Sequence, residues 1–106
     1  MAQFDVHRNT GRHKTSIPFV VVVQSSQFKN YHRRVVVPLV RASVVGAVPF
    51  AVFNPSFTIR GVKVVLHPLE IVSLPVDQLG SKVGSLAASD QQIIAALDEL
   101  FSQAWN

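Results

Sequence analysis

The sequence contains no cysteine among its 106 residues. Disulfide bonds and thiolate chemistry are therefore excluded, both as structural elements and as catalytic ones. The chain also has no apolar run close to the roughly 18 residues that a membrane-spanning helix needs, and its first residues lack the apolar region of a signal peptide. We therefore expect a cytoplasmic protein that makes no contact with a membrane.

Acidic residues are missing from a long stretch of the chain. None occurs between Asp5 and Glu70, an interval that holds nine basic residues: Arg8, Arg12, Lys14, Lys29, Arg33, Arg34, Arg41, Arg60 and Lys63. From Glu70 onward the balance reverses, with five acidic residues and a single basic one, Lys82. This asymmetry indicates either solvated basic loops or a surface for a polyanionic partner, which is nucleic acid or an acidic protein segment.

Charged residues are also scarce overall, at 15% of the chain, whereas apolar residues make up 48%. A chain of this length forms one domain, residues 1–106. Its core is too small to bury so many apolar side chains, and some of them should remain exposed in a monomer. We therefore expect a homodimer whose interface buries the apolar strands and the C-terminal helix.

Short apolar runs separated by turn residues predict several β-strands. The predicted strands cover residues 3–6, 17–25, 35–39, 50–53, 57–59 and 62–75, the last interrupted at Pro68. Residues 40–49 are expected to form a loop with a short helical turn, and residues 76–86 a connector. The short turns between consecutive strands favour antiparallel pairing.

One helix is predicted from Ser89 to the end of the chain. Ser89 and Gln92 have the spacing of a capping box, and Asp90 suits the positive end of the helix dipole. Apolar residues follow at helical spacing as one stripe: Ile93, Ile94, Leu97, Leu100, Phe101 and Ala104. Strands followed by a single helix indicate an α+β fold, a small curled antiparallel sheet with the helix on one face.

The only tryptophan, Trp105, lies one residue from the end of the sequence. Its spacing from Phe101 continues the apolar stripe, which favours a ring packed against the core. The alternative is a ring held out as a contact for a partner, because tryptophan is enriched at interface hot spots.

Catalytic motifs are absent from the sequence. The four histidines lack metal-binding spacing, and there is no phosphate-binding loop, dinucleotide fingerprint or nucleophile elbow. We expect no metal, no cofactor and no catalytic site. One enzymatic alternative remains, in which His7, Arg12, His13 and Ser16 line a basic groove and RNA is cleaved by attack of its 2′-hydroxyl. An exposed basic loop is the simpler interpretation.

Several segments, taken in order, resemble the CcdB family of bacterial toxins. They are QFDV (3–6), PFVVVVQS (18–25), RRVVVPL (33–39), IVSLPVDQLGSKVGSL (71–86) and DQQIIAALDELF (90–101). None is a catalytic signature, but together they span nearly the whole chain. The resemblance implies a curled antiparallel barrel of the SH3-like kind with one C-terminal helix, a homodimer, and a binding protein instead of an enzyme.

The resemblance also implies a function. Toxins of this family bind the A subunit of DNA gyrase while it holds cleaved DNA and block religation, and an antitoxin of the CcdA kind neutralises them with an acidic tail. DNA is then contacted only indirectly, through the toxin–antitoxin complex. The implied target-binding residues lie at the end of the chain: Phe101, Gln103, Trp105 and Asn106. The expected receptors of the antitoxin tail are basic: Arg8, Arg12, Lys14, Arg33 and Arg34.

The end of the sequence departs from the family pattern. Gyrase-poisoning members have Trp-Gly-Ile directly after the phenylalanine that matches Phe101, whereas this chain continues Ser102, Gln103, Ala104 and only then Trp105. Two alternatives follow from this departure. One is a non-toxic homologue that has lost gyrase binding, and the other is an mRNA endoribonuclease like the MazF toxins, which share the fold.

Overall fold

The computed structural model describes residues 2–47 and 50–102. Its strands are β1 (Asp5–Asn9), β2 (Phe19–Val22), β3 (Arg33–Arg41), β4 (Ser56–Ile59), β5 (Val62–Leu66), β6 (Val72–Pro75) and β7 (Leu79–Ser85). The helices are α1 (Ala42–Val45) and α2 (Asp90–Ser102), and the short 3₁₀ turns are η1 (Ser26–Phe28), η2 (Pro68–Glu70), η3 (Val76–Gln78) and η4 (Ala87–Ser89). The strands therefore come first and the long helix last, as the sequence predicts.

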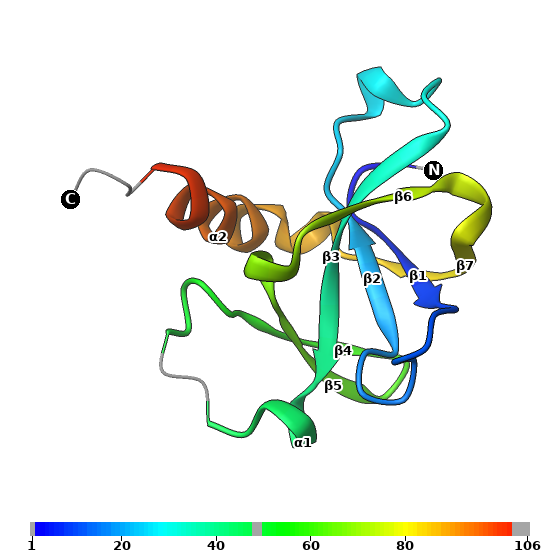
Figure 1. The fold of residues 1–106 in the computed structure, drawn as a ribbon. Helices are drawn as coiled ribbons and strands as arrows, with labels where there is room; N and C mark the ends of the chain where they lie inside the picture. Colours follow the sequence, from blue (N-terminus) through cyan, green and yellow to red (C-terminus); the bar gives the residue numbers. More distant parts are fainter. Residues whose placement is uncertain (1, 48–49, 103–106) are drawn as a thin grey trace.

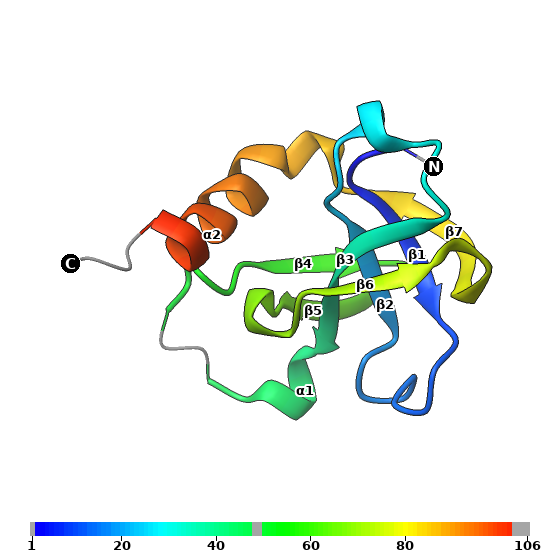
Figure 2. The same cartoon turned by 45° about the horizontal axis from the view of Figure 1, so that its top comes forward.

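The strands form one antiparallel sheet in the order β4-β5-β3-β2-β1-β7, with β6 joined to β3. One edge of β3 pairs with two strands: residues 33–36 pair with β6, and residues 39–41 pair with β5. The sheet curls, and Arg60 Nε in the turn after β4 donates to Val83 O of β7 at 3.2 Å. This contact joins the two ends of the strand order, and α2 lies beside the curled sheet (Figures 1 and 2). The predicted α+β fold is confirmed.

The core lies between the curled sheet and α2. Fully buried side chains from four strands meet the helix there: Val6, Val21, Val37, Leu39, Val64 and Leu66 with Ile93 and Ala96. A smaller cluster on the other face of the sheet holds Val20, Val22 and Val36 beneath Leu74 and Leu79. Strand β2 is thus covered on both faces, which explains its unbroken apolar run.

Two predicted segments are wrong. Residues 51–53 form a turn instead of a strand, closed by a hydrogen bond from Asn54 N to Phe50 O at 2.7 Å. Most of the expected connector at 76–86 is strand β7, which pairs with β1. A Cβ at Gly80 would lie 2.6 Å from Arg8 O, so the glycine is what permits the two backbones to approach this closely.

Helix α2 is confirmed over residues 90–102, and Ala104 lies outside the described residues. The expected N-cap, Ser89, belongs to the 3₁₀ turn η4 instead. The apolar stripe of α2 is not one buried face. Ile93 and Ala96 are fully buried, whereas Ile94 is 40% exposed and Phe101 67% exposed. The helix runs past the edge of the sheet, so its last turns have less to pack against (Figure 1). Within residues 2–47 and 50–102, no helix is long and apolar enough to cross a membrane.

Candidate functional site

An open groove of about 660 Å³ lies between the segment that follows β2, the strands β3 and β6, and helix α2. Its apolar walls come from distant parts of the sequence: Val23, Phe28, Tyr31, Val35, Ile71, Leu97 and Phe101. Three of the aromatic side chains are unusually exposed, Phe28 at 45%, Tyr31 at 65% and Phe101 at 67%. Exposed apolar residues around a groove are typical of an interaction site.

The aromatic loop, residues 24–32, forms one side of this groove and is held by hydrogen bonds from two side chains, those of Arg34 and Gln24. The buried guanidinium of Arg34 donates to the carbonyls of Lys29, Tyr31 and Arg33. The Gln24 side chain donates to Phe28 O at 3.1 Å and accepts from Val35 N at 3.0 Å. The loop therefore presents its aromatic side chains from a fixed backbone.

Phe28 and Tyr31 also contact each other within the aromatic loop. Their rings meet edge to face, with centroids 6.3 Å apart. Arg33 lies beside them in the groove, and its side chain donates to Ser73 Oγ at 2.9 Å and Ser73 O at 2.8 Å. The groove thus combines apolar walls with one cation held in place by β6.

The basic residues expected to bind the antitoxin tail lie at two ends of the sheet. Arg33 and Arg34 begin β3, whereas Arg8, Arg12 and Lys14 lie at or after the end of β1. Strand β3 runs from one end to the other in nine residues, or eight steps of about 3.3 Å, which is roughly 26 Å. Arg34 is 7% exposed and committed to loop carbonyls, while the other four are exposed.

Two basic residues that the sequence reasoning did not single out join the second group. Arg41 Nε donates to Thr15 O in the β1–β2 loop at 3.0 Å. Arg41 and Lys63 line the same shallow pocket beside α1. Both fall in the acid-free interval, but only the pairing of β3 with β5 brings them to this end of the sheet.

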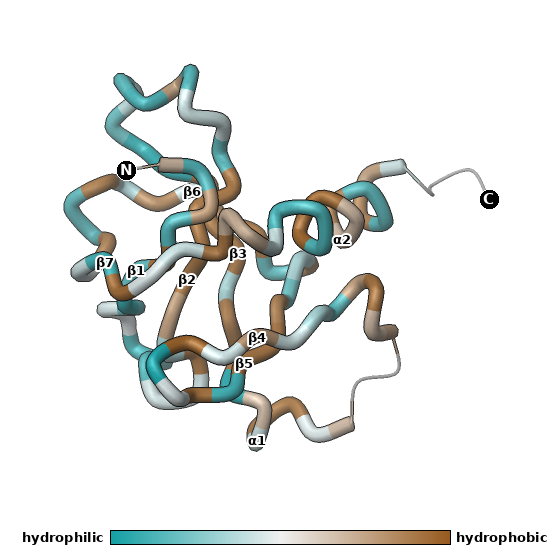
Figure 3. Tube along the Cα trace, turned by 180° about the vertical axis from the view of Figure 1, so that it is seen from behind, coloured by the Kyte–Doolittle hydropathy of each residue, from teal (hydrophilic) through white to brown (hydrophobic). Residues whose placement is uncertain are grey.

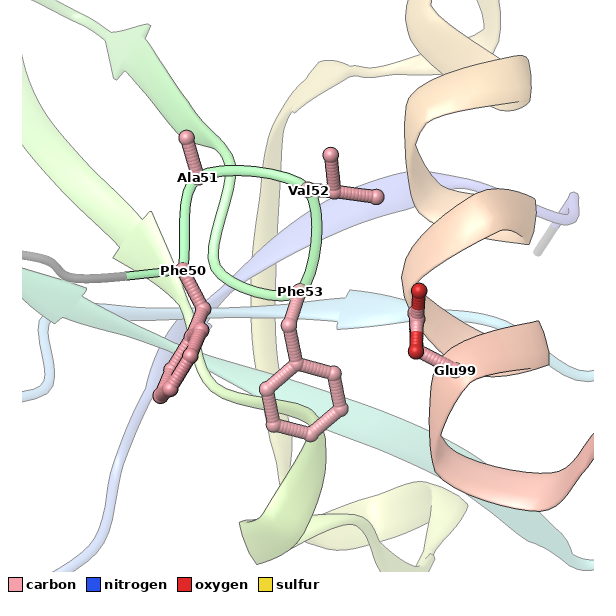
Figure 4. Close-up of a pocket in the computed structure, with 5 residues that line it drawn as sticks. All are labelled: Phe50, Ala51, Val52, Phe53 and Glu99. Carbon is pink, nitrogen blue, oxygen red and sulfur yellow. The ribbon is translucent and has the colours of Figure 1, made fainter. Parts of the chain in front are cut away.

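A second hollow, of about 480 Å³, separates α2 from the turn at residues 50–53. We call it the turn hollow, and its lining residues are Phe50, Ala51, Val52, Phe53 and Glu99. Figure 4 shows the rings of Phe50 and Phe53 projecting on the same side of the turn, with the Glu99 side chain facing the turn from α2. The sequence does not predict this hollow, because the apolar run at residues 50–53 has the pattern of a strand.

A family model described as CcdB protein matches residues 3–102. The chain belongs to the CcdB family. A search of curated proteins gives no match to the chain. The family match agrees with the curled antiparallel sheet and its C-terminal helix, and it points to a toxin of a toxin–antitoxin system.

The target-binding residues expected of a CcdB-family toxin are described only in part. Phe101 lies on α2 at the rim of the groove. Gln103, Trp105 and Asn106 lie outside the described residues. The two interpretations of Trp105, core packing and partner contact, therefore stay predictions.

The residues of the ribonuclease alternative do not form one open site in this CcdB-family chain. His7 is buried within β1, and its Nδ1 lies 2.9 Å from Gly80 O. Arg12 and His13 are exposed on the β1–β2 loop, and Ser16 donates back to His13 O at 3.3 Å. No cluster of three potential metal ligands occurs in the described part of the chain.

Proposed function

We propose that this chain is a cytoplasmic toxin of a type II toxin–antitoxin system that binds the A subunit of DNA gyrase and traps its cleavage complex with DNA. One observation carries the proposal, the 67% exposure of Phe101 on α2 beside a groove with aromatic walls. A phenylalanine that buries so little of its apolar surface in its own fold can bury more of it against a partner, which favours binding. Gln103, Trp105 and Asn106 follow it in the sequence and extend the proposed target surface.

The same groove supports a homodimer. Its floor is apolar and half-buried, with Val35 from β3, Ile71 before β6 and Leu97 from α2. A second copy related by a two-fold axis covers this floor with the same surface of its own. The two Phe101 side chains then frame one composite target surface. Light scattering at micromolar concentration is expected to give the mass of a dimer, and a monomer would contradict this arrangement.

We further propose that an acidic antitoxin tail binds the end of the sheet that carries Arg8, Arg12 and Lys14. Arg41 and Lys63 add to the positive charge at this end. Clustered positive charge steers an oppositely charged segment, and salt screens the attraction. DNA contact occurs only through the toxin–antitoxin complex.

The proposal is tested by inducing the gene in a host that carries gyrase. The expected result is growth arrest together with covalent gyrase–DNA complexes. Phe101→Ala is expected to lose both, whereas Val44→Ala, which truncates a 59% exposed residue of α1, keeps them. Arrest without trapped complexes would contradict gyrase as the target, and a folded dimer that causes no arrest would identify a non-toxic homologue.

A further inference from the structure

The turn hollow combines two phenylalanine rings with one carboxylate, that of Glu99. We propose that it binds a cationic side chain, arginine or lysine, supplied by a partner protein. This site lies apart from the groove and does not depend on the toxin function proposed above.

The turn side of the hollow carries exposed apolar side chains. Phe50 is 66% exposed and Val52 62% exposed. Both belong to a segment, residues 42–59, that contains no charged residue. Figure 3 shows this segment as predominantly apolar on either side of residues 48–49. The face of a phenylalanine ring attracts a cation, most strongly when the pair is shielded from water.

Glu99 adds negative charge at the same place. It is an exposed residue of α2, and its side chain faces the turn (Figure 4). No lysine or arginine follows Lys82 in the sequence. Within residues 2–47 and 50–102, the one ion pair joins Lys82 to Asp5. Among the described residues, Glu99 therefore has no cationic partner.

An arginine side chain matches both halves of the hollow. Its planar guanidinium stacks on an aromatic ring and pairs with a carboxylate through two parallel N–H groups. Lysine satisfies the charge but not the stacking, and should therefore bind more weakly. The occupant we propose is an arginine on a segment of another protein.

The position of the hollow on α2 leaves it free when the groove is occupied. Leu97 and Phe101 face the groove, and Glu99 is two residues from each of them. Two residues along a helix correspond to a rotation of about 200°, so the groove and the hollow lie on opposite sides of α2. A dimer formed through the groove therefore still presents the hollow to a further protein.

The experiment is an NMR titration of the isotope-labelled full chain with N-acetyl-arginine amide. The ring resonances of Phe50 and Phe53 and the amide of Glu99 are expected to shift and saturate at millimolar probe. N-acetyl-lysine amide is expected to bind several-fold more weakly, and N-acetyl-glutamate amide to leave the resonances unchanged. Shifts that never saturate would overturn the proposal. So would the same shifts appearing with protein concentration alone, because the occupant would then be a second copy.

Matched variants distinguish binding of the probe in the turn hollow from general attraction of a cation to the negative charge of α2. Glu99→Gln removes the carboxylate in the hollow, while Asp98→Asn removes a neighbouring carboxylate that does not line it. Glu99→Gln is expected to weaken binding at least tenfold, Phe53→Leu several-fold, and Asp98→Asn less than twofold. Equal losses in Glu99→Gln and Asp98→Asn would overturn the site. Circular dichroism of each variant before titration shows that the fold is intact.

Discussion

Two adjacent isoleucines on α2 allow the orientation of this helix against the sheet to be tested. Ile93 is fully buried against the sheet, whereas Ile94 is 40% exposed. The sequence assigns both to the same apolar stripe, so only the structure distinguishes them. Truncation of each to alanine removes the same atoms from two environments, and the difference between the variants reports the orientation of the helix.

The expected losses follow from burial. Ile93→Ala removes three carbons at about 0.8 kcal/mol each, or about 2.4 kcal/mol, before any cavity is counted. The cavity left in a packed core raises the loss to about 3–4 kcal/mol, within the range seen for such truncations. Ile94→Ala loses only the buried part of its side chain and leaves no enclosed cavity, so we expect about 1 kcal/mol.

The assay is urea unfolding at one fixed protein concentration, because the apparent stability of a dimer depends on concentration. The free energy of unfolding is expected to fall by about 2 kcal/mol more for Ile93→Ala than for Ile94→Ala. Equal losses would refute this orientation of α2, and with it the assignment of the groove and the turn hollow to opposite sides of the helix. If the comparison is repeated at a higher protein concentration and the Ile94→Ala loss grows, that residue lies in a contact between copies.

Three further predictions concern other parts of the chain. Arg12→Glu is expected to weaken binding of the cognate antitoxin tail more than Arg33→Glu does, and a higher salt concentration should weaken binding of the wild-type protein. Calorimetry measures both effects. An affinity that stays the same under both changes would contradict the proposed antitoxin site at the Arg8, Arg12 and Lys14 end of the sheet. Gly80→Ala should lower the free energy of unfolding by about 1–3 kcal/mol, because the new Cβ meets a backbone oxygen. Trp105→Ala should abolish any toxicity while costing about 1 kcal/mol in stability, and a loss near 3–5 kcal/mol would show that the ring belongs to the core.

The sequence predicts best where local pattern and tertiary environment agree. The sequence predicts β2 correctly because a strand covered on both faces is apolar throughout, and it predicts α2 from the helical spacing of its apolar residues. Strand β7 could not be predicted, since its glycines and lysine have low strand propensity and its conformation comes from pairing with β1. Residues 50–53 carry a strand-like run of apolar residues but have no strand to pair with.

The candidate site likewise contains features that the sequence predicts and features that only the structure shows. The exposed Phe101 and the basic interval are visible in the sequence, and the family pattern draws attention to both. The role of Arg34 is not visible, because a sequence gives its charge but not the three loop carbonyls that accept its hydrogen bonds. The turn hollow depends on a helix and a turn about 46 residues apart in the chain, which only tertiary packing brings together.

Strand β3 pairs with β2 on one edge and with both β5 and β6 on the other. Strands β1 and β7 reach it only through β2, and β4 reaches it only through β5. In the strand pairing, β1, β2 and β7 are therefore connected to β4, β5 and β6 through this strand. Its inner amides should exchange with solvent deuterium only when the whole molecule unfolds, while the edge strands β4 and β7 exchange through smaller openings. We therefore expect the two halves of the sheet to unfold together, in one cooperative transition.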